Sequence, residues 1–278
     1  MSCVDVARKE RHHNMTLVPS WQFTSDEVIG YIAGGGEHGV QIATTADGKP
    51  GTRSKCMNLE HYYSRSCKDG FFVPRYKAKT HAEKISEDAV RVQVEPYENW
   101  RIHATIDFRI TPGPIIEVRY EFLFQAAFRG FEAFISNYFH APVEPFLHVN
   151  GQWQQPKLAD NEHRSWARGA AEVENMLAIR VPGTNPGSDI ELPIDPAYYD
   201  YPILVTPIPD SAQSIVNIAE AKHCSSLSAN RRWNAHDFSL IARDVAEGEK
   251  VVCRAWLCCV KLASLDDALR LAERLERS

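Results

Sequence analysis

The fold of this chain is decided by one stretch, residues 100–125, which reads WRIHATIDFRITPGPIIEVRYEFLFQ. Apolar and polar residues alternate on both sides of a break formed by Thr111, Pro112, Gly113 and Pro114. A period of two is typical of β-strands that pack one face against a core. The stretch therefore predicts two antiparallel strands joined at the break.

The register of this hairpin follows from its apolar faces. If both faces point toward the same core, the natural pairing sets Arg109 opposite Glu117 and Asp107 opposite Arg119. The polar face then carries its own opposite-charge pairs. This pattern indicates a large antiparallel sheet and says little about chemistry.

Shorter strand-like runs continue the pattern along the chain, without the alternating helices that parallel strands need as crossovers. They are expected at residues 28–33, 40–45, 71–73, 89–95, 131–140, 145–149, 176–181, 203–208, 214–219, 238–243 and 250–262. The aromatic spacing near residues 131–140 also fits a helix, but the aromatic content favours a strand.

One helix is expected, at residues 266–275. Ser264 is its expected N-cap, and Asp267 follows three residues later as in a capping box. Its apolar stripe is formed by Leu265, Leu269, Ala272 and Leu275. We therefore expect a single all-β domain over residues 1–278, with an irregular N-terminal segment of about 20 residues and a short C-terminal helix.

Composition excludes several classes of partner. The net charge of -5 and the absence of a Lys or Arg run give no electrostatic footprint for nucleic acid. No segment approaches the roughly 18 apolar residues of a membrane span, and the N-terminus lacks an apolar signal segment. The 7 cysteines are an odd number without a Cys-x-x-Cys pair, which is typical of reduced thiols. We expect a cytoplasmic protein that binds neither nucleic acid nor membranes.

Sequence motifs predict neither a cofactor nor a metal. Residues 34–39 read GGGEHG and match the glycine pattern of dinucleotide sites, but residues 40–45 continue as a strand where such a site needs a helix. A turn between strands is the better interpretation. His140 and His148 lie eight residues apart, and the spacing identifies no third metal ligand.

Three long connections, residues 150–170, 182–202 and 220–237, carry many aromatic and titratable side chains. Long loops of this kind are usually functional. Their side chains include Trp153, His163, Trp166, Tyr198, Tyr199, Tyr201, His223, Arg231, Arg232, Trp233 and His236. Aromatic faces and planar polar groups suit a neutral polyol, although any single aromatic residue could equally anchor its loop to the sheet.

Several strands resemble those of galactose mutarotase-like proteins. The segment 238–262 is similar to their closing hairpin, and residues 115–122 and 130–139 are similar to their middle strands. The resemblance extends over about residues 89–262 and implies a large antiparallel β-supersandwich whose concave sheet and edge loops hold a carbohydrate. In members that interconvert sugar anomers, a carboxylate takes the anomeric hydroxyl proton and a His protonates the ring oxygen.

The leading hypothesis is therefore a carbohydrate-active protein, an aldose 1-epimerase-like isomerase that acts on a small sugar or sugar derivative. His140 is the expected acid and Glu132 the expected base. The residues expected to bind the sugar, in one cleft, are Arg75, Arg119, His148, Trp153, Trp233 and His236. Two alternatives are a non-catalytic carbohydrate-binding protein and a glycoside hydrolase or lyase, which would need two facing carboxylates or a Tyr/His pair.

Overall fold

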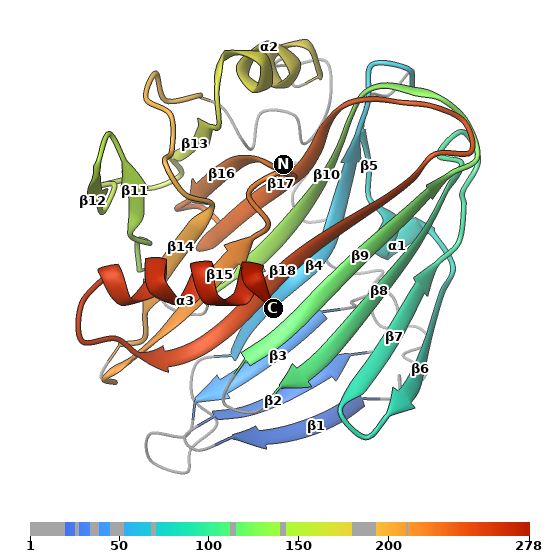
Figure 1. Ribbon diagram of the computed structural model, residues 1–278. Helices are drawn as coiled ribbons and strands as arrows, with labels where there is room; N and C mark the ends of the chain where they lie inside the picture. Colours follow the sequence, from blue (N-terminus) through green and yellow to red (C-terminus); the bar gives the residue numbers. More distant parts are fainter. Residues whose placement is uncertain are drawn as a thin grey trace, which may run out of the picture.

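The computed structural model describes residues 20–25, 28–33, 39–44, 53–67, 71–111, 115–139, 143–179, 193–209 and 211–278. Within these residues the strands form two large antiparallel sheets that face each other, as Figure 1 shows. The expected all-β fold with a C-terminal helix is confirmed. His140 and residues 34–38 of the glycine-rich segment lie outside the described residues.

The larger sheet holds nine of the described strands. In order across the sheet these are β1 (Ser20–Ser25), β2 (Val28–Ala33), β3 (Gly39–Thr44), β4 (Arg53–Tyr63), β10 (Phe128–Tyr138), β17 (Ala235–Val245), β16 (Cys224–Asn230) and β13 (His163–Ala167), with β5 (Phe71–Phe72) paired to β4 outside this order. β2 and β3, which flank the glycine-rich segment, pair antiparallel. A strand, and not a helix, therefore follows the glycines, as expected.

The second sheet holds seven of the described strands. Its order is β14 (Ile203–Pro207), β15 (Gln213–Ala219), β18 (Lys250–Lys261), β9 (Ile115–Phe124), β8 (Ile102–Thr111), β7 (Ala89–Val94) and β6 (Thr80–Ser86). The remaining described elements are a hairpin of β11 (Leu147–Val149) and β12 (Gln152–Gln154), and the helices α1 (Pro74–Lys77), α2 (Ala170–Ile179) and α3 (Asp266–Arg277).

The β8–β9 hairpin has the register that its apolar faces predict. Arg109 lies opposite Glu117, and Asp107 lies opposite Arg119. The Asp107 carboxylate receives its two hydrogen bonds from Arg91 of β7, at 2.7 and 2.9 Å, while Arg119 approaches it only to 3.9 Å. The ion pairs thus extend over the three strands β7, β8 and β9. The buried apolar face sets the register, because ion pairs near the surface contribute little to stability.

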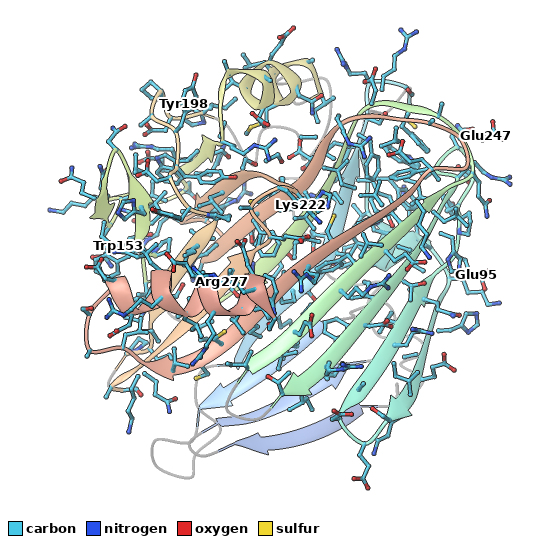
Figure 2. All side chains as sticks on the ribbon, in the orientation of Figure 1. Glu95, Trp153, Tyr198, Lys222, Glu247 and Arg277 are labelled. Atoms are coloured by element: carbon cyan, nitrogen blue, oxygen red, sulfur yellow. The ribbon has the colours of Figure 1, made fainter. Side chains whose placement is uncertain are left out.

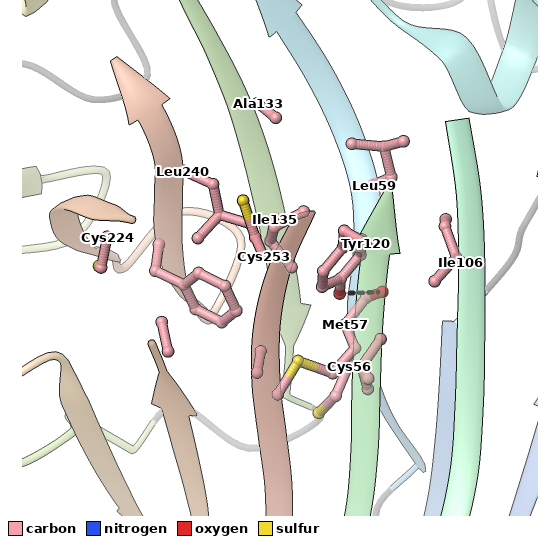
Figure 3. Close-up of a cluster of buried hydrophobic side chains, with 14 of the residues drawn as sticks. Cys56, Met57, Leu59, Ile106, Tyr120, Ala133, Ile135, Cys224, Leu240 and Cys253 are labelled. Carbon is pink, nitrogen blue, oxygen red and sulfur yellow. Dashed lines mark hydrogen bonds between the residues drawn. The ribbon is translucent and has the colours of Figure 1, made fainter. Parts of the chain in front are cut away.

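The core lies between the two sheets. From the seven-stranded sheet it receives Ile106, Phe108, Tyr120 and Phe122, and from the larger sheet it receives Leu59, Phe131, Ala133 and Ile135. Figure 3 shows part of this cluster, with Tyr120 reaching across toward β4. Because Phe131, Ala133 and Ile135 point into the core, alternate residues of β10 point to the opposite face of the larger sheet.

α3 covers the outer face of the seven-stranded sheet (Figure 1). Its Ala268, Leu271 and Ala272 pack on a second apolar cluster contributed by β14, β15 and β18. The helix begins at Asp266 with Leu265 as N-cap, so the expectation that Ser264 caps it is wrong by one residue. The Asp267 carboxylate does accept a hydrogen bond from the Ser264 N–H at 2.8 Å, which is the reach-back half of a capping box.

Several elements differ from the sequence expectation. Residues 176–179, expected to begin a strand, form the end of α2, since the apolar run continues an Ala- and Glu-rich helical segment. The segment with ambiguous aromatic spacing is a strand, β10. Six strands were not expected at all: β1, β4, β6, β12, β13 and β16. Two of these, β4 and β16, carry residues that line the pocket described next.

Candidate functional site

A pocket of about 400 Å³ lies on the face of the larger sheet that points away from the core. It is bordered by strands β4, β10 and β17, by α1 and by the turn between β16 and β17. Its lining residues are Lys55, Glu60, His61, Arg75, Tyr76, Phe134, Tyr138, Asn230, Trp233, Ala235 and Asp237. Phe134 and Tyr138 alternate with the core residues of β10, which places the pocket on the outer face of this sheet.

Irregularities in β4 turn its polar side chains toward the pocket. Met57 has a φ of 61°, and the β4–β10 register shifts beside it. The Met57 N–H donates to the Asn137 Oδ1 at 2.9 Å, and its carbonyl accepts from the Tyr120 hydroxyl at 3.0 Å, the dashed line of Figure 3. A second register shift lets the adjacent Glu60 and His61 both line the pocket, which a regular strand would not allow.

Glu60 is a buried carboxylate with a full set of partners. Its Oε1 lies 2.7 Å from Arg75 Nη2 and 3.6 Å from His61 Nε2, and its Oε2 accepts from the Ser136 hydroxyl at 2.9 Å. Burial acts to raise the pKa of Glu60, but the hydrogen bond and charge of His61, with Arg75 and Ser136, outweigh it and lower that pKa. Glu60 therefore stays ionised at neutral pH and acts as a fixed negative charge.

Arg75 reaches the pocket from α1. Its guanidinium lies 4.3 Å from the ring centroid of Tyr76 and 5.8 Å from that of Tyr138, besides its ion pair with Glu60. Among the described residues, its buried Nε has no hydrogen-bond partner. A buried donor without a partner is costly, so a ligand oxygen that reached this N–H would gain a hydrogen bond.

Asp237 is the second buried carboxylate of the pocket. It extends from β17, and its Oδ1 accepts a hydrogen bond from the backbone N–H of Asn137 at 2.7 Å. Burial, and then the charges of Glu60 and Asp237, raise the pKa of the neighbouring Tyr138. Tyr138 thus stays a neutral phenol that can donate a hydrogen bond.

The remaining wall is aromatic. The His61 ring stacks on Phe134 with centroids 5.4 Å apart, and its Nδ1 lies 3.1 Å from the Tyr63 hydroxyl. Trp233, on the turn between β16 and β17, is 51% exposed although it lines the pocket. The pocket therefore combines fixed charges, hydrogen-bonding groups and flat apolar surfaces.

The structure brings together two of the residues that the sequence suggested for sugar binding, Arg75 and Trp233. Glu132, the expected base, is fully buried on β10, two residues before Phe134 and on the side where α2 packs against the sheet. It does not line the pocket, because this end of the strand is covered. The expected acid, His140, lies outside the described residues.

The structure places the other four expected binding residues outside this pocket. Arg119 lies on the solvent face of the seven-stranded sheet, bonded to Glu121 at 2.6 Å, since β9 belongs to the other sheet. His148 and Trp153 lie on the β11–β12 hairpin, where His148 bonds to Asp200 and Trp153 donates to Asp266, the first residue of α3 (Figure 2).

His236 is also removed from the pocket, because it precedes Asp237 on β17 and points to the opposite face. It is buried, its Nδ1 lies 2.7 Å from the Thr206 Oγ1, and its ring packs on Phe139. Burial lowers the pKa of His236 to about 3. It is a neutral core histidine.

Sequence reasoning missed Lys55, Glu60, His61, Tyr138 and Asp237. β4 carries polar residues on both sides of a bulge, so its sequence has no period of two. The signal that could have found part of the site is a histidine next to an acidic residue, within or beside an apolar run. This occurs at Glu60-His61 and at His236-Asp237. In the part of the chain that the structure describes, no three His, Cys, Asp or Glu side chains are grouped to hold a metal ion. None of its helices has the length and hydropathy needed to cross a membrane.

Comparison with known proteins identifies the fold through structure, not sequence. No protein-family model and no curated protein matches this chain. A protein of Escherichia coli K12 provisionally assigned as an aldose 1-epimerase superimposes with a TM-score of 0.54 at 8% identity, covering 88% of this chain and 100% of its own. A GalM/aldose epimerase homologue from C. elegans superimposes with a TM-score of 0.53 at 6% identity. The match covers 88% of this chain and 99% of that protein.

The α-N-acetylgalactosaminidase NagBb of Bifidobacterium bifidum, solved with GalNAc, gives a TM-score of 0.56 at 11% identity. The match covers 92% of this chain and 38% of that enzyme. At such identities the likeness shows the fold alone. This chain has the galactose mutarotase-like supersandwich fold that its strands resemble in sequence.

Proposed function

We propose that this protein binds a carbohydrate in the pocket over β4, β10 and β17, and acts on it as an aldose 1-epimerase-like isomerase. The observation that carries the proposal is one pocket that unites an exposed aromatic ring, Trp233, with two buried carboxylates, Glu60 and Asp237. Sugars offer C–H patches for flat rings and hydroxyls for charged acceptors. The aldose 1-epimerases among the structures with this fold support the reaction class.

Asp237 is the proposed general base. Anomer exchange needs an acceptor for the proton of the anomeric hydroxyl, and Glu60 is poorly suited because Arg75 holds it as an ion-paired anion. Asp237 is held in place by the Asn137 N–H, which donates a hydrogen bond to its Oδ1. His61, beside Glu60, is the proposed donor of a proton to the ring oxygen, and His140 remains a prediction for the same role.

The test is a screen of free sugars by ligand-detected NMR, with anomer exchange measured in the same samples. Asp237→Asn should slow the exchange of a bound sugar by about 10²-fold or more while changing its affinity little, because a lost general base affects the reaction and not the binding. Asp160→Asn is the matched control, since the Asp160 side chain is 95% exposed and outside the pocket.

The alternatives predict different outcomes of the same screen. Binding without accelerated exchange would support a non-catalytic carbohydrate-binding protein. Products formed from an oligosaccharide would support a hydrolase or lyase, for which the pocket offers a pair of carboxylates and a pair of Tyr138 with His61. Failure of every sugar to bind would contradict the proposal.

A further inference from the structure

The pocket changes in character from its floor to its rim. On the floor, Glu60, His61 and Asp237 are only 3%, 6% and 3% exposed. At the rim, Tyr76 is 58% and Trp233 51% exposed, and both line the same cavity. Two exposed aromatic rings that border the same polar cavity offer flat apolar surfaces on which a ligand can stack.

The two rim rings stand on opposite sides of the floor. Tyr76 belongs to α1, which packs against β4, whereas Trp233 belongs to the turn that joins β16 to β17. β10 and β17 lie between β4 and β16 in the sheet, so these two strands are roughly 14 Å apart, given a strand spacing of about 4.8 Å.

An arginine holds each rim ring. The Arg75 guanidinium lies 4.3 Å from the Tyr76 centroid, and the Arg232 guanidinium lies 5.2 Å from the Trp233 centroid. A cation over one face of an aromatic ring restricts how the ring can turn. Both rings are therefore positioned before a ligand arrives, which lowers the entropic cost of stacking on them.

The volume of the pocket exceeds what one sugar ring needs. A hexose of twelve non-hydrogen atoms, packed as densely as organic matter in a protein interior, fills on the order of half of the 400 Å³. A single ring on the polar floor would leave the space next to the rim empty.

We infer that the pocket takes a disaccharide unit, with one ring on the floor between Glu60 and Asp237 and the second ring stacked on Trp233 or Tyr76. This inference rests on the proposed function and names its substrate class. The floor makes the charged hydrogen bonds, and the rim supplies the affinity for the second ring.

The experiment compares affinities for matched sugars by calorimetric or NMR titration. The monosaccharides are glucose, galactose and N-acetylgalactosamine, and the disaccharides are maltose, cellobiose, lactose and melibiose. At least one disaccharide should bind about 10-fold more tightly than its component monosaccharides, the usual size of one added stacking contact. Trp233→Ala or Tyr76→Ala should lower the disaccharide affinity by roughly 5- to 10-fold and the monosaccharide affinity by clearly less.

Tyr198→Ala is the control, since Tyr198 is also exposed but lies in a loop outside the pocket (Figure 2). It should leave both affinities unchanged. Monosaccharide binding without any gain for a disaccharide, or an equal loss for both in the rim variants, would overturn the inference and leave the proposed function standing. No binding by any of these sugars would overturn both.

Discussion

Glu60 keeps its charge inside the protein because the hydrogen bond and charge of His61, the Arg75 guanidinium at 2.7 Å and the Ser136 hydroxyl together outweigh the effect of burial. Arg75→Met should therefore lower the free energy of unfolding at pH 7 by about 3 to 5 kcal/mol, the usual cost of leaving one partner of a buried ion pair alone. The measurement is urea denaturation. Lys77→Met, on the exposed face of the same helix, is the control and should have little effect.

The pH dependence of this variant provides an internal check. Because the folded protein lowers the pKa of Glu60, its stabilising contribution is present above the ordinary value of 4.5 and is lost as the pH falls through the folded pKa. In Arg75→Met the part of that contribution that comes from Arg75 is gone, so its stability should fall less steeply below pH 4.5. A loss no larger than that of Lys77→Met would contradict this account of the ion pair.

His236 also makes the protein sensitive to mild acid. Its pKa is lowered by burial, whereas that of Glu60 is lowered by its partners. Burial lowers its pKa from 6.5 to about 3. Between these pH values His236 is protonated in the unfolded chain and neutral in the folded protein. Stability from this group is complete above pH 6.5 and declines as the pH falls toward 3. His236→Asn should lose about 1 kcal/mol at pH 7, with the Thr206 hydrogen bond, and should show a shallower decline below pH 6.5.

The measurement is thermal or urea unfolding at several pH values between 7 and 4, which covers most of the interval between the ordinary pKa of 6.5 and the folded pKa of about 3 of His236. His103→Asn, on a half-buried residue of β8 far from Thr206 in the fold, serves as the control. An unchanged slope in His236→Asn would show that other groups cause the acid sensitivity.

At the scale of the element, the bulge in β4 is held by a side chain from the opposing sheet. The Tyr120 hydroxyl donates to the Met57 carbonyl at 3.0 Å, and both groups are buried. Tyr120→Phe should lower the free energy of unfolding by about 1 to 3 kcal/mol, because the buried carbonyl loses its partner. Since the bulge lies between the pocket residues Lys55 and Glu60 on β4, the same variant should also weaken sugar binding.

The chain provides a matched control for this substitution. The Tyr62 hydroxyl is buried on the same strand as the bulge and has no hydrogen-bond partner among the described residues. Tyr62→Phe removes a polar group that is already unsatisfied, so it should leave the stability unchanged or raise it. Equal losses in the two variants, measured by urea denaturation, would contradict the role assigned to Tyr120.

The same strand explains how much of the fold the sequence could predict. The β8–β9 hairpin was predictable down to its register because one face of each strand is apolar and the other is charged. β4 and β16 were not, because β4 carries Glu60 and His61 beside a bulge and β16 is buried along its whole length with four small polar residues among seven. Strands that build a polar pocket lose the alternation by which strands are recognised.

At the scale of the whole molecule, the two sheets serve different purposes. The seven-stranded sheet has its inner face in the core, and its outer face is covered partly by α3 and partly by ion pairs such as Arg91 with Asp107 (Figure 1). The larger sheet shares the core through one face and leaves the pocket on the other. Arg75 and Trp233 could be suggested from the sequence as polar and aromatic groups near strand ends, but only the folded sheet shows that they meet Glu60 and Asp237.

The central claim is that a sugar binds over β4, β10 and β17, and the most direct test is a crystal structure of the protein soaked with the sugar that binds best in the NMR screen. We predict density for a ring between Glu60 and Asp237, with a second ring against Trp233 or Tyr76 if a disaccharide is used. Density for the sugar beside His148 on the β11–β12 hairpin, or no ordered sugar in a pocket that is open in the crystal, would contradict the account.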